Sequence, residues 1–249
     1  MNNIHATSSE TRSLRTVRYG LTLAIAAGAS LLLAPLAYRL TRSLPALLLV
    51  PVAFLLDLVA LALLAAGLIA ARRRGSSPEL RRAVLGLLIV LVVLAFPIAT
   101  LISARGAPVI HDVTTDTEDP PSFVAVLPHR EGALNPVDYG GPDVAARQQQ
   151  GYPDLAPLHL DVPPDQAFDR ALAAVHEMSW VLVAADPSAR RIEATDTTWW
   201  FGFKDDVVVR VRPEGGGSRI DVRSLSRVGG GDLGTNAKRV AAYLQRLGA

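Results

Sequence analysis

Three long runs of apolar residues near the N-terminus constrain this chain more than any other feature. Residues 20–38 and 83–104 contain no charged side chain, and residues 44–71 contain one, Asp57. A helix needs about 20 apolar residues to cross the roughly 30 Å hydrocarbon core of a bilayer, and each run is long enough. The sequence therefore predicts an α-helical membrane anchor with three transmembrane helices, at about residues 20–38, 44–71 and 83–104.

The arginines that flank these runs predict the direction of insertion. Three lie in the N-terminal tail (residues 1–18), two in the first connection and five in the second connection. Because arginine in short loops stays in the cytoplasm, the tail and the second connection are expected to be cytoplasmic. The first run could instead be the core of a signal peptide, but it is longer than such cores usually are, and two further spans follow it.

The composition also indicates the source of the chain. Only two lysines stand against twenty-three arginines, as is typical of a bacterium with a G+C-rich genome. We therefore expect a multi-pass protein of the bacterial inner (plasma) membrane, with the lipid bilayer as a partner. Its N-terminus would be cytoplasmic and its C-terminal domain periplasmic.

Asp57 lies near the middle of the second predicted span, where an ionised carboxylate costs a few kcal/mol. No Lys, Arg, His or Glu lies within any of the three runs, so the sequence offers no relay of ionisable groups. Three interpretations remain open. A protonated Asp57 could hydrogen-bond to Thr22, Ser30 or a backbone carbonyl freed by Pro51, it could contact a second subunit, or it could handle protons or ions.

The second half of the chain has the composition of a water-soluble domain. Residues 105–249 carry fifteen Lys and Arg against twenty Asp and Glu, a balance that argues against nucleic acid as a partner. The chain has no Cys, which excludes disulfides, thiolate metal ligands and Cys nucleophiles. Ten of the seventeen prolines fall between residues 105 and 164. We expect residues 105–157 to form a Pro-rich extracytoplasmic arm that leaves the membrane and then lies along the domain, irregular except for a short strand at 123–127.

Residues 158–249 show clear periodicities. A strand at 158–162 is followed by a helix that opens at Pro163-Pro164 and buries Phe168, Leu172 and Val175 at helical spacing. Alternating segments at 180–185, 191–198, 205–212 and 219–226 read as strands, and residues 233–247 as a last helix. The sequence predicts an α+β domain in the order strand, helix, four-stranded antiparallel meander, helix.

The Gly-rich turn at 215–217 suggests that Arg212 lies opposite Arg219, and this register assigns side chains to two faces. The face expected to meet the helices holds Val207, Val209, Val211, Ile220 and Val222. The other face holds Asp206, Arg210, Arg212, Asp221, Arg223 and Arg227. These charges could pair across strands, as Arg210 would with Asp221. They could also bind an anion or a protein partner, or take part in catalysis.

In the same register Asp205 lies opposite Ser226, beside a stretch of aromatic residues. Polar groups and exposed aromatic side chains would converge at this end of the sheet, which makes it the best candidate for a binding site. The predicted binding surface comprises Asp205, Arg210, Arg223, Ser226, Arg227, Trp199 and Phe201. No catalytic residue is assigned.

Other patterns point to chemistry only weakly. Gly229, Gly231 and Gly234 match G-x-G-x-x-G, but no strand follows to complete a nucleotide-binding unit, so a turn with Asp232 or Thr235 capping the last helix is favoured. Acidic residues at 112–118 resemble the start of a calcium loop without its closing ligand. The histidines lack the spacing of a zinc site. We expect no metal and no cofactor.

Three stretches carry a resemblance to a known family. They are IHDVTTDTEDPP at 110–121, EATDTTWWFGFKDDVVVR at 193–210, and DVRSLSRVG at 221–229 continuing to DLGTN at 232–236. In this order they resemble the bacterial and plastid family called domain of unknown function 1499, over roughly residues 108–247. The resemblance implies a fold and an envelope setting but no reaction, substrate or catalytic residue. Many relatives have a Cys near the start of the domain, and this sequence has none.

The leading hypothesis is a non-enzymatic envelope protein whose anchor holds a binding or scaffolding domain at the periplasmic face of the membrane. Its partners would be envelope proteins or lipids. One alternative is a membrane-anchored hydrolase acting near Asp205, Ser224, Ser226 and Arg227. A further alternative is a carrier for a lipid or another small molecule, enclosed between helix and meander.

Overall fold

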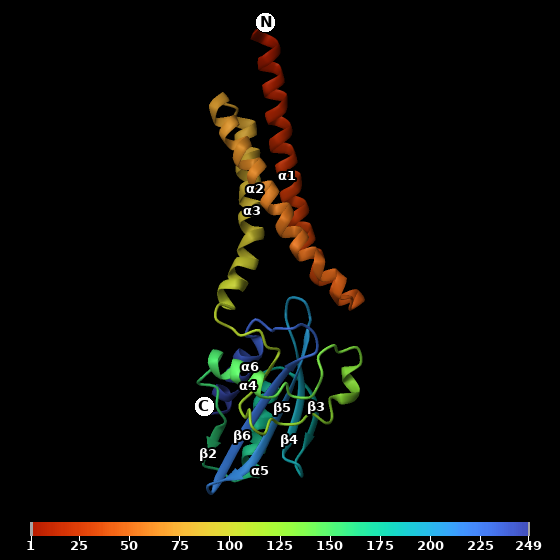
Figure 1. The fold of residues 1–249 in the computed structure, drawn as a ribbon, viewed down its shortest axis with the longest axis vertical. Coiled ribbons are helices and arrows are strands. Elements are labelled where there is room, and N and C mark those ends of the chain that lie inside the picture. Colours follow the sequence, from red (N-terminus) through yellow and green to blue (C-terminus); the bar gives the residue numbers. More distant parts are fainter. Residues whose placement is uncertain (1, 249) are drawn as a thin grey trace. The chain divides into compact units, whose positions relative to one another are not determined.

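A computed structural model describes the backbone of residues 2–248 and the side chains of residues 14–248. The chain divides into two compact units, Met1–Ser103 and Ala104–Ala249, each of which is described by itself. Figure 1 shows a helical first unit and a second unit built on a sheet. Arg12 of the predicted cytoplasmic tail and His5 lie outside the residues whose side chains are described.

The first unit is a three-helix anchor. It consists of α1 (Asn2–Thr41), the short 3-10 helix η1 (Leu44–Leu48), α2 (Leu49–Arg74) and α3 (Ser77–Ser103). Within the described residues, Leu14–Thr41, Leu44–Arg74 and Ser77–Ser103 are each long and apolar enough to cross a membrane. The three predicted apolar helices are therefore confirmed, and all three extend into the arginine-bearing residues beside the predicted runs.

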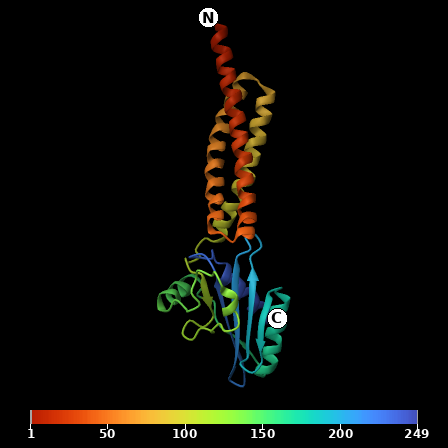
Figure 2. The same cartoon turned by 90° about the vertical axis from the view of Figure 1, so that its right-hand side faces the viewer.

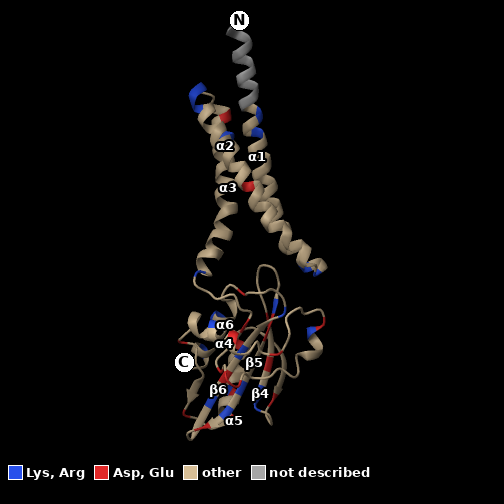
Figure 3. Ribbon diagram, viewed as in Figure 1, with Lys and Arg blue, Asp and Glu red and all other residues tan. Residues whose placement is uncertain are grey.

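Small residues let the three helices approach closely, as is usual in membrane bundles. Ala24, Ala27 and Ala60 are fully buried among the helices. A methyl group added at Gly67 would lie 2.5 Å from Val17 Cγ2, and one added at Gly86 would clash with Leu64. Figure 2 shows the three helices running along one another, and Figure 3 shows few charged residues along α2 and α3. The outward side chains are large and apolar, as lipid contact requires.

Asp57 is fully buried inside this unit. Neither of its carboxylate oxygens has a hydrogen-bond partner among the described residues, so the expected bonds to Thr22, Ser30 or a freed carbonyl are not formed. The buried α2 residues one turn before and one turn after Asp57 are alanines, which have no polar side chain to offer. Thr22 is exposed on the outside of α1.

The second unit is an α+β domain with an antiparallel sheet. Its strands are β1 (Asp112–Thr114), β2 (Leu158–Leu160), β3 (Val181–Asp186), β4 (Arg191–Thr197), β5 (Lys204–Glu214) and β6 (Gly217–Ser226). Their order is β1-β6-β5-β4-β3, and β2 also pairs with β6. The helices are α4 (Pro142–Gly151), α5 (Pro164–Glu177) and α6 (Thr235–Leu247). The predicted order of strand, helix, meander and helix is confirmed as β2, α5, β3 to β6, and α6.

The predicted register is confirmed as well. Arg212 lies opposite Arg219, and Asp205 lies opposite Ser226. The turn that joins β5 to β6 contains Gly215 and Gly216 with φ of 57° and 87°, a conformation that favours glycine over residues with a side chain. Val207, Val209 and Val211 of β5 and Val222 of β6 consequently face α5 and α6 in one core, whereas Val208 faces the arm.

The arm differs from its prediction. Residues 123–127 do not form a strand, because the backbone N–H groups of Val124 and Val126 donate to the Glu193 carboxylate instead of to a neighbouring strand. A short 3-10 helix, η2 (Leu127–Arg130), follows, and α4 and β1 were not predicted. The arm packs along the domain, as expected, since the compact unit begins at Ala104 and β1 pairs with β6.

Aromatic side chains fill the core between the sheet and the two helices that cover it. Trp180 and Tyr243 stack with their ring centroids 5.2 Å apart, and Phe168 and Ile192 are buried beside them. The Tyr243 hydroxyl donates a 2.8 Å hydrogen bond to the carbonyl of Ala171, which joins α6 to α5. The opposite face of the sheet is covered by the arm.

Candidate functional site

Arg223 forms a deeply buried ion pair between the sheet and the arm. Its guanidinium binds both carboxylate oxygens of Asp112, at 2.9 and 2.7 Å, and donates to the carbonyls of Pro121 and Val137. The rings of Phe123 and Tyr139 lie 5.1 and 5.5 Å from the guanidinium carbon. Burial and the Asp112 carboxylate raise the pKa of Tyr139 to about 12, so the phenol stays neutral. Arg223 therefore binds β6 to the arm at Asp112, Pro121 and Val137.

Asp206, near the start of β5, binds two further arginines. Its carboxylate is fully buried and binds Arg130 of η2 and Arg227, whose NH2 group lies 2.7 Å away. The Thr195 hydroxyl donates to the same carboxylate at 2.8 Å. This cluster fixes η2 against the sheet.

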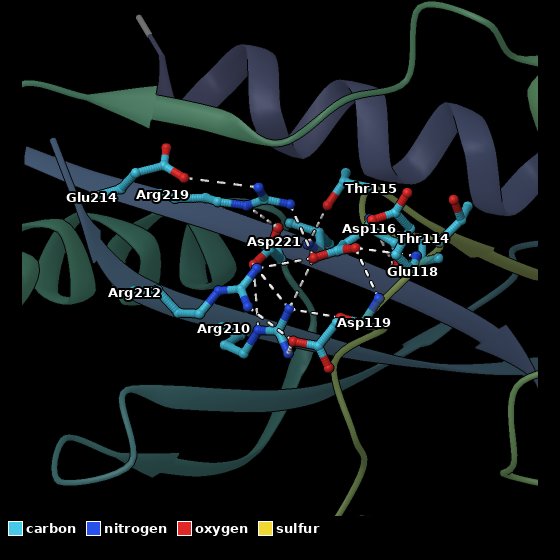
Figure 4. A network of polar contacts seen from close by, with 12 residues as sticks. Thr114, Thr115, Asp116, Glu118, Asp119, Arg210, Arg212, Glu214, Arg219 and Asp221 are labelled. Atoms are coloured by element: carbon cyan, nitrogen blue, oxygen red, sulfur yellow. Dashed lines mark hydrogen bonds and ion pairs between the residues drawn. The ribbon is translucent and has the colours of Figure 1, made fainter.

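Asp116 and Asp119 of the arm close a third cluster, drawn in Figure 4. The Asp116 carboxylate lies 2.9 Å from Arg212 and Arg219 and 3.3 Å from Arg210. Asp221 of β6 binds the same three arginines, at 2.8 to 3.1 Å. Asp119 pairs with Arg210 and Arg212. Three arginines thus meet three carboxylates, and the arginine excess expected on this face is neutralised by the arm.

This cluster shifts the acid–base properties of its members. Burial alone would raise the pKa of Asp116, but hydrogen bonds from the Asp119 backbone and from Arg212, together with the charge of Arg219, lower it overall. Asp221 and Asp116 raise the pKa of Arg219 although burial opposes this. The ionised forms are favoured on both sides.

Acid should therefore weaken the second unit through Asp116. A pKa that is lower in the folded than in the unfolded chain stabilises the fold above the unfolded value of about 4. That contribution is lost as the pH falls through the folded pKa. In Asp116→Asn we expect the urea midpoint to fall less steeply between neutral and acid pH than it does in the unsubstituted chain. The midpoint is measured by tryptophan fluorescence with the chain in detergent. An unchanged pH slope would contradict the assigned role.

Asp205 and Ser226 lie together, as predicted, but on the helix-covered face of the sheet. The Asp205 carboxylate lies 2.6 Å from Arg239 of α6. The Asn236 amide donates to Ser226 at 2.9 Å and accepts from Ser224 at 2.7 Å. Arg239 and Asn236 were not found from the sequence, although their spacing of three residues puts them on the buried side of α6. Arg210, Arg223 and Arg227 lie on the opposite face, so the predicted binding surface is divided by the sheet.

Asp232 confirms the predicted cap of the last helix. Its carboxylate accepts hydrogen bonds from the backbone N–H groups of Gly234 and Asn236. Burial raises the pKa of Asp232 although these bonds oppose the shift. The Gly-rich stretch before α6 therefore serves as a capped turn.

The aromatic stretch forms a closed loop, residues 198–203, between β4 and β5. The Thr198 backbone N–H donates to the Phe203 carbonyl at 2.8 Å, and the Thr198 hydroxyl accepts from the Phe203 N–H. The rings of Phe201 and Phe203 stack at 5.1 Å. Trp199 lies 5.1 Å from Trp200 and remains 77% exposed. The loop thus exposes the Trp199 side chain, while Trp200, Phe201 and Phe203 are partly buried.

The chemistry available to these groups is limited by their partners. Ser224 directs its hydroxyl proton to an amide oxygen, not to a base. The arm acids that resembled a calcium loop do not converge, because Asp112 faces Arg223 and Asp116 faces three arginines. Among the residues that the structure describes, no group of three His, Asp or Glu side chains could hold a metal ion. The arrangement suits cohesion of the domain better than a reaction.

Comparison with known proteins agrees with the resemblance noted in the sequence. Curated proteins give no match. The family model described as "Protein of unknown function (DUF1499)" matches residues 112–247, from the first residue of β1 to the last residue of α6. The match covers more than half of the chain and includes the arm together with the sheet. The chain therefore belongs to the DUF1499 family.

Proposed function

We propose that this chain is an inner-membrane protein that presents a non-enzymatic binding or scaffolding domain on the periplasmic side and serves the organisation of the envelope. One observation carries the proposal. Five arginines of the arm-covered sheet face, Arg210, Arg212, Arg219, Arg223 and Arg227, each pair with an aspartate of the same domain. A face whose charges are satisfied internally needs no ligand and holds its shape without one.

The groups a hydrolase would need are engaged in the same way. A nucleophilic serine requires a neighbouring base within hydrogen-bond reach. Ser224 is fully buried and is bonded to Asn236 and Arg239 instead. A carrier would need interior space between the helices and the sheet, and there Trp180, Tyr243 and Phe168 pack together. Both arrangements support the scaffolding function over its alternatives.

The arginines support the proposed orientation. Arg72, Arg73 and Arg74 end α2, and Arg81 and Arg82 begin the second turn of α3. Only Arg39 and Arg42 flank the first connection. The difference of five against two predicts a cytoplasmic second connection and, after one further span, an extracytoplasmic second unit.

Reporter fusions test this orientation. Alkaline phosphatase, which is active only outside the cytoplasm, should be active when fused after residue 248 and inactive when fused after Ser76 in the second connection. A green fluorescent reporter at the same two sites should give the reverse pattern. Activity of the phosphatase at Ser76 with none at residue 248 would overturn the periplasmic assignment.

Photo-crosslinking in living cells tests the scaffolding function. Photoreactive amino acids would replace Ala189 in the β3–β4 turn and Val124 on the arm, both exposed side chains without a role in the ion pairs. A scaffold should give discrete, light-dependent protein adducts at one of these sites, and the partner can then be identified from the band. Adducts with lipid alone, or none at either site, would contradict the proposal.

A further inference from the structure

One end of the sheet receives the chain from the last membrane helix. We call it the tether end; here β4 and β6 finish at Thr197 and Ser226, and β5 begins at Lys204. Just before β1, the His111 carbonyl accepts from Ser226 N–H at 2.9 Å, and the Ile110 carbonyl accepts from Asp232 N–H at 3.0 Å. Ile110 is buried, so the chain is packed into the domain from this residue onward.

The covalent connection limits how far the tether end can be from the membrane. Six residues separate the end of α3 at Ser103 from Ile110. Fully extended they span at most about 25 Å. A turn closed by the Ala107 N–H and the Ala104 carbonyl shortens this reach. Any surface at the tether end is therefore held close to lipid.

Exposed apolar side chains collect at this same end. The described part of the second unit has seven large apolar residues with exposed side chains, and five belong to the tether end. Leu134 is placed there by its N–H bond to the Arg227 carbonyl, and Val181 begins β3 opposite Thr195. We call the five the apolar rim: Val109, Leu134, Val181, Trp199 and Leu233.

The two ends of the sheet contrast in polarity. The opposite end bears the β5–β6 turn with Glu214 and Arg219, and the β3–β4 turn with Asp186 and Arg190. The only two lysines of the chain, Lys204 and Lys238, are both exposed near the tether end, at the start of β5 and in the first turn of α6. Tryptophan and long basic side chains are the residues that proteins place at membrane interfaces.

We propose that the apolar rim rests in the interfacial layer of the bilayer, with Trp199 and Leu134 among lipid headgroups and upper acyl chains. The lipid surface is the occupant because the short tether keeps the rim beside it, and because exposed apolar side chains with a tryptophan among them suit the interfacial layer. Lipid contact would fix the orientation of the domain on the membrane, which a single covalent tether cannot do. The proposal holds for either direction of insertion and does not depend on the scaffolding function.

The absence of cysteine from the chain allows a clean test on the full-length protein. Trp199→Cys carries a fluorophore on the rim, and Ala189→Cys carries the same fluorophore at the opposite end of the sheet. Both proteins are reconstituted into phosphatidylcholine and phosphatidylglycerol vesicles containing a lipid with a nitroxide headgroup. We expect quenching at position 199 to exceed that at position 189 at least about twofold, and aqueous iodide to show the reverse order.

Two further measurements guard against a misfolded variant. In the unsubstituted chain, lipid nitroxide should quench only part of the tryptophan fluorescence, since Trp180 is buried in the core and Trp199 is exposed. Adding Leu134→Glu to the labelled Trp199→Cys protein should reduce the lipid quenching, because a carboxylate resists the interface. Equal lipid quenching at positions 199 and 189 would overturn the proposal. Protection from iodide at 199 without lipid quenching would do so too, and would indicate a protein cover.

Discussion

Replacing Arg223 with alanine is expected to destabilise the second unit by about 3–5 kcal/mol, since it leaves a buried carboxylate without its partner. Asp112 is almost fully buried, and Arg223 is its bidentate partner. The same change frees the carbonyls of Pro121 and Val137. The measurement is urea unfolding followed by tryptophan fluorescence, with Trp199 and Trp200 replaced by Phe so that Trp180 reports alone and with the full chain in detergent.

A matched double variant separates the charge from the packing. Asp112→Leu with Arg223→Met removes both buried charges and keeps apolar volume, so most of the lost stability should return. Limited proteolysis of Arg223→Ala should also cut the chain within residues 115–140 before it cuts the sheet. If the double variant is as unstable as the single one, the ion pair is not what holds the arm.

The meander could be predicted because its signals are local. Val209 and Val211 alternate with Arg210 and Arg212, and the glycines that follow allow one tight turn. Once that turn is placed, the two-residue period decides every cross-strand partner, including Asp205 with Ser226. The membrane spans were equally predictable, because length and apolarity alone define them.

The arm could not be predicted from local signals. Asp116 meets Arg219 across 103 residues of sequence, and Asp112 meets Arg223 across 111. Its prolines indicated irregular structure correctly, but irregular backbone gives no periodicity from which to assign contacts. One clue was present, since an arm rich in aspartate precedes a sheet face rich in arginine. Complementary charge between those segments could have indicated which face of the sheet the arm covers.

The candidate site shows the same division between local and distant information. Alternation placed Asp205 and Arg210 on opposite faces from the start, so a binding surface containing both could not lie on one side of the sheet. The exposed aromatic loop was foreseeable from its composition. The partners of Asp205 and Ser226 were not, because Arg239 and Asn236 come from α6 and meet the sheet only through tertiary packing.

Replacing Tyr243 with alanine should cost the second unit about 3–5 kcal/mol for a different reason, the loss of a large buried aromatic side chain. Tyr243 is fully buried, stacks on Trp180 and donates its hydroxyl hydrogen to the Ala171 carbonyl. Burial raises the pKa of Tyr243, so the hydroxyl keeps its proton and the bond persists at alkaline pH. The expected result is a lower urea midpoint together with an altered Trp180 emission.

Tyr243→Phe provides the matched control, because it removes the hydrogen bond and keeps the ring. Its cost should be about 1 kcal/mol, the net worth of one such bond. The two variants also distinguish the two sides of the sheet. Tyr243→Ala loosens the helix-covered core but leaves the ion pairs of the arm in place, so proteolysis should not select residues 115–140, as it should in Arg223→Ala. Equal costs for Tyr243→Phe and Tyr243→Ala would mean that the hydrogen bond, and not the packed ring, joins α6 to the domain.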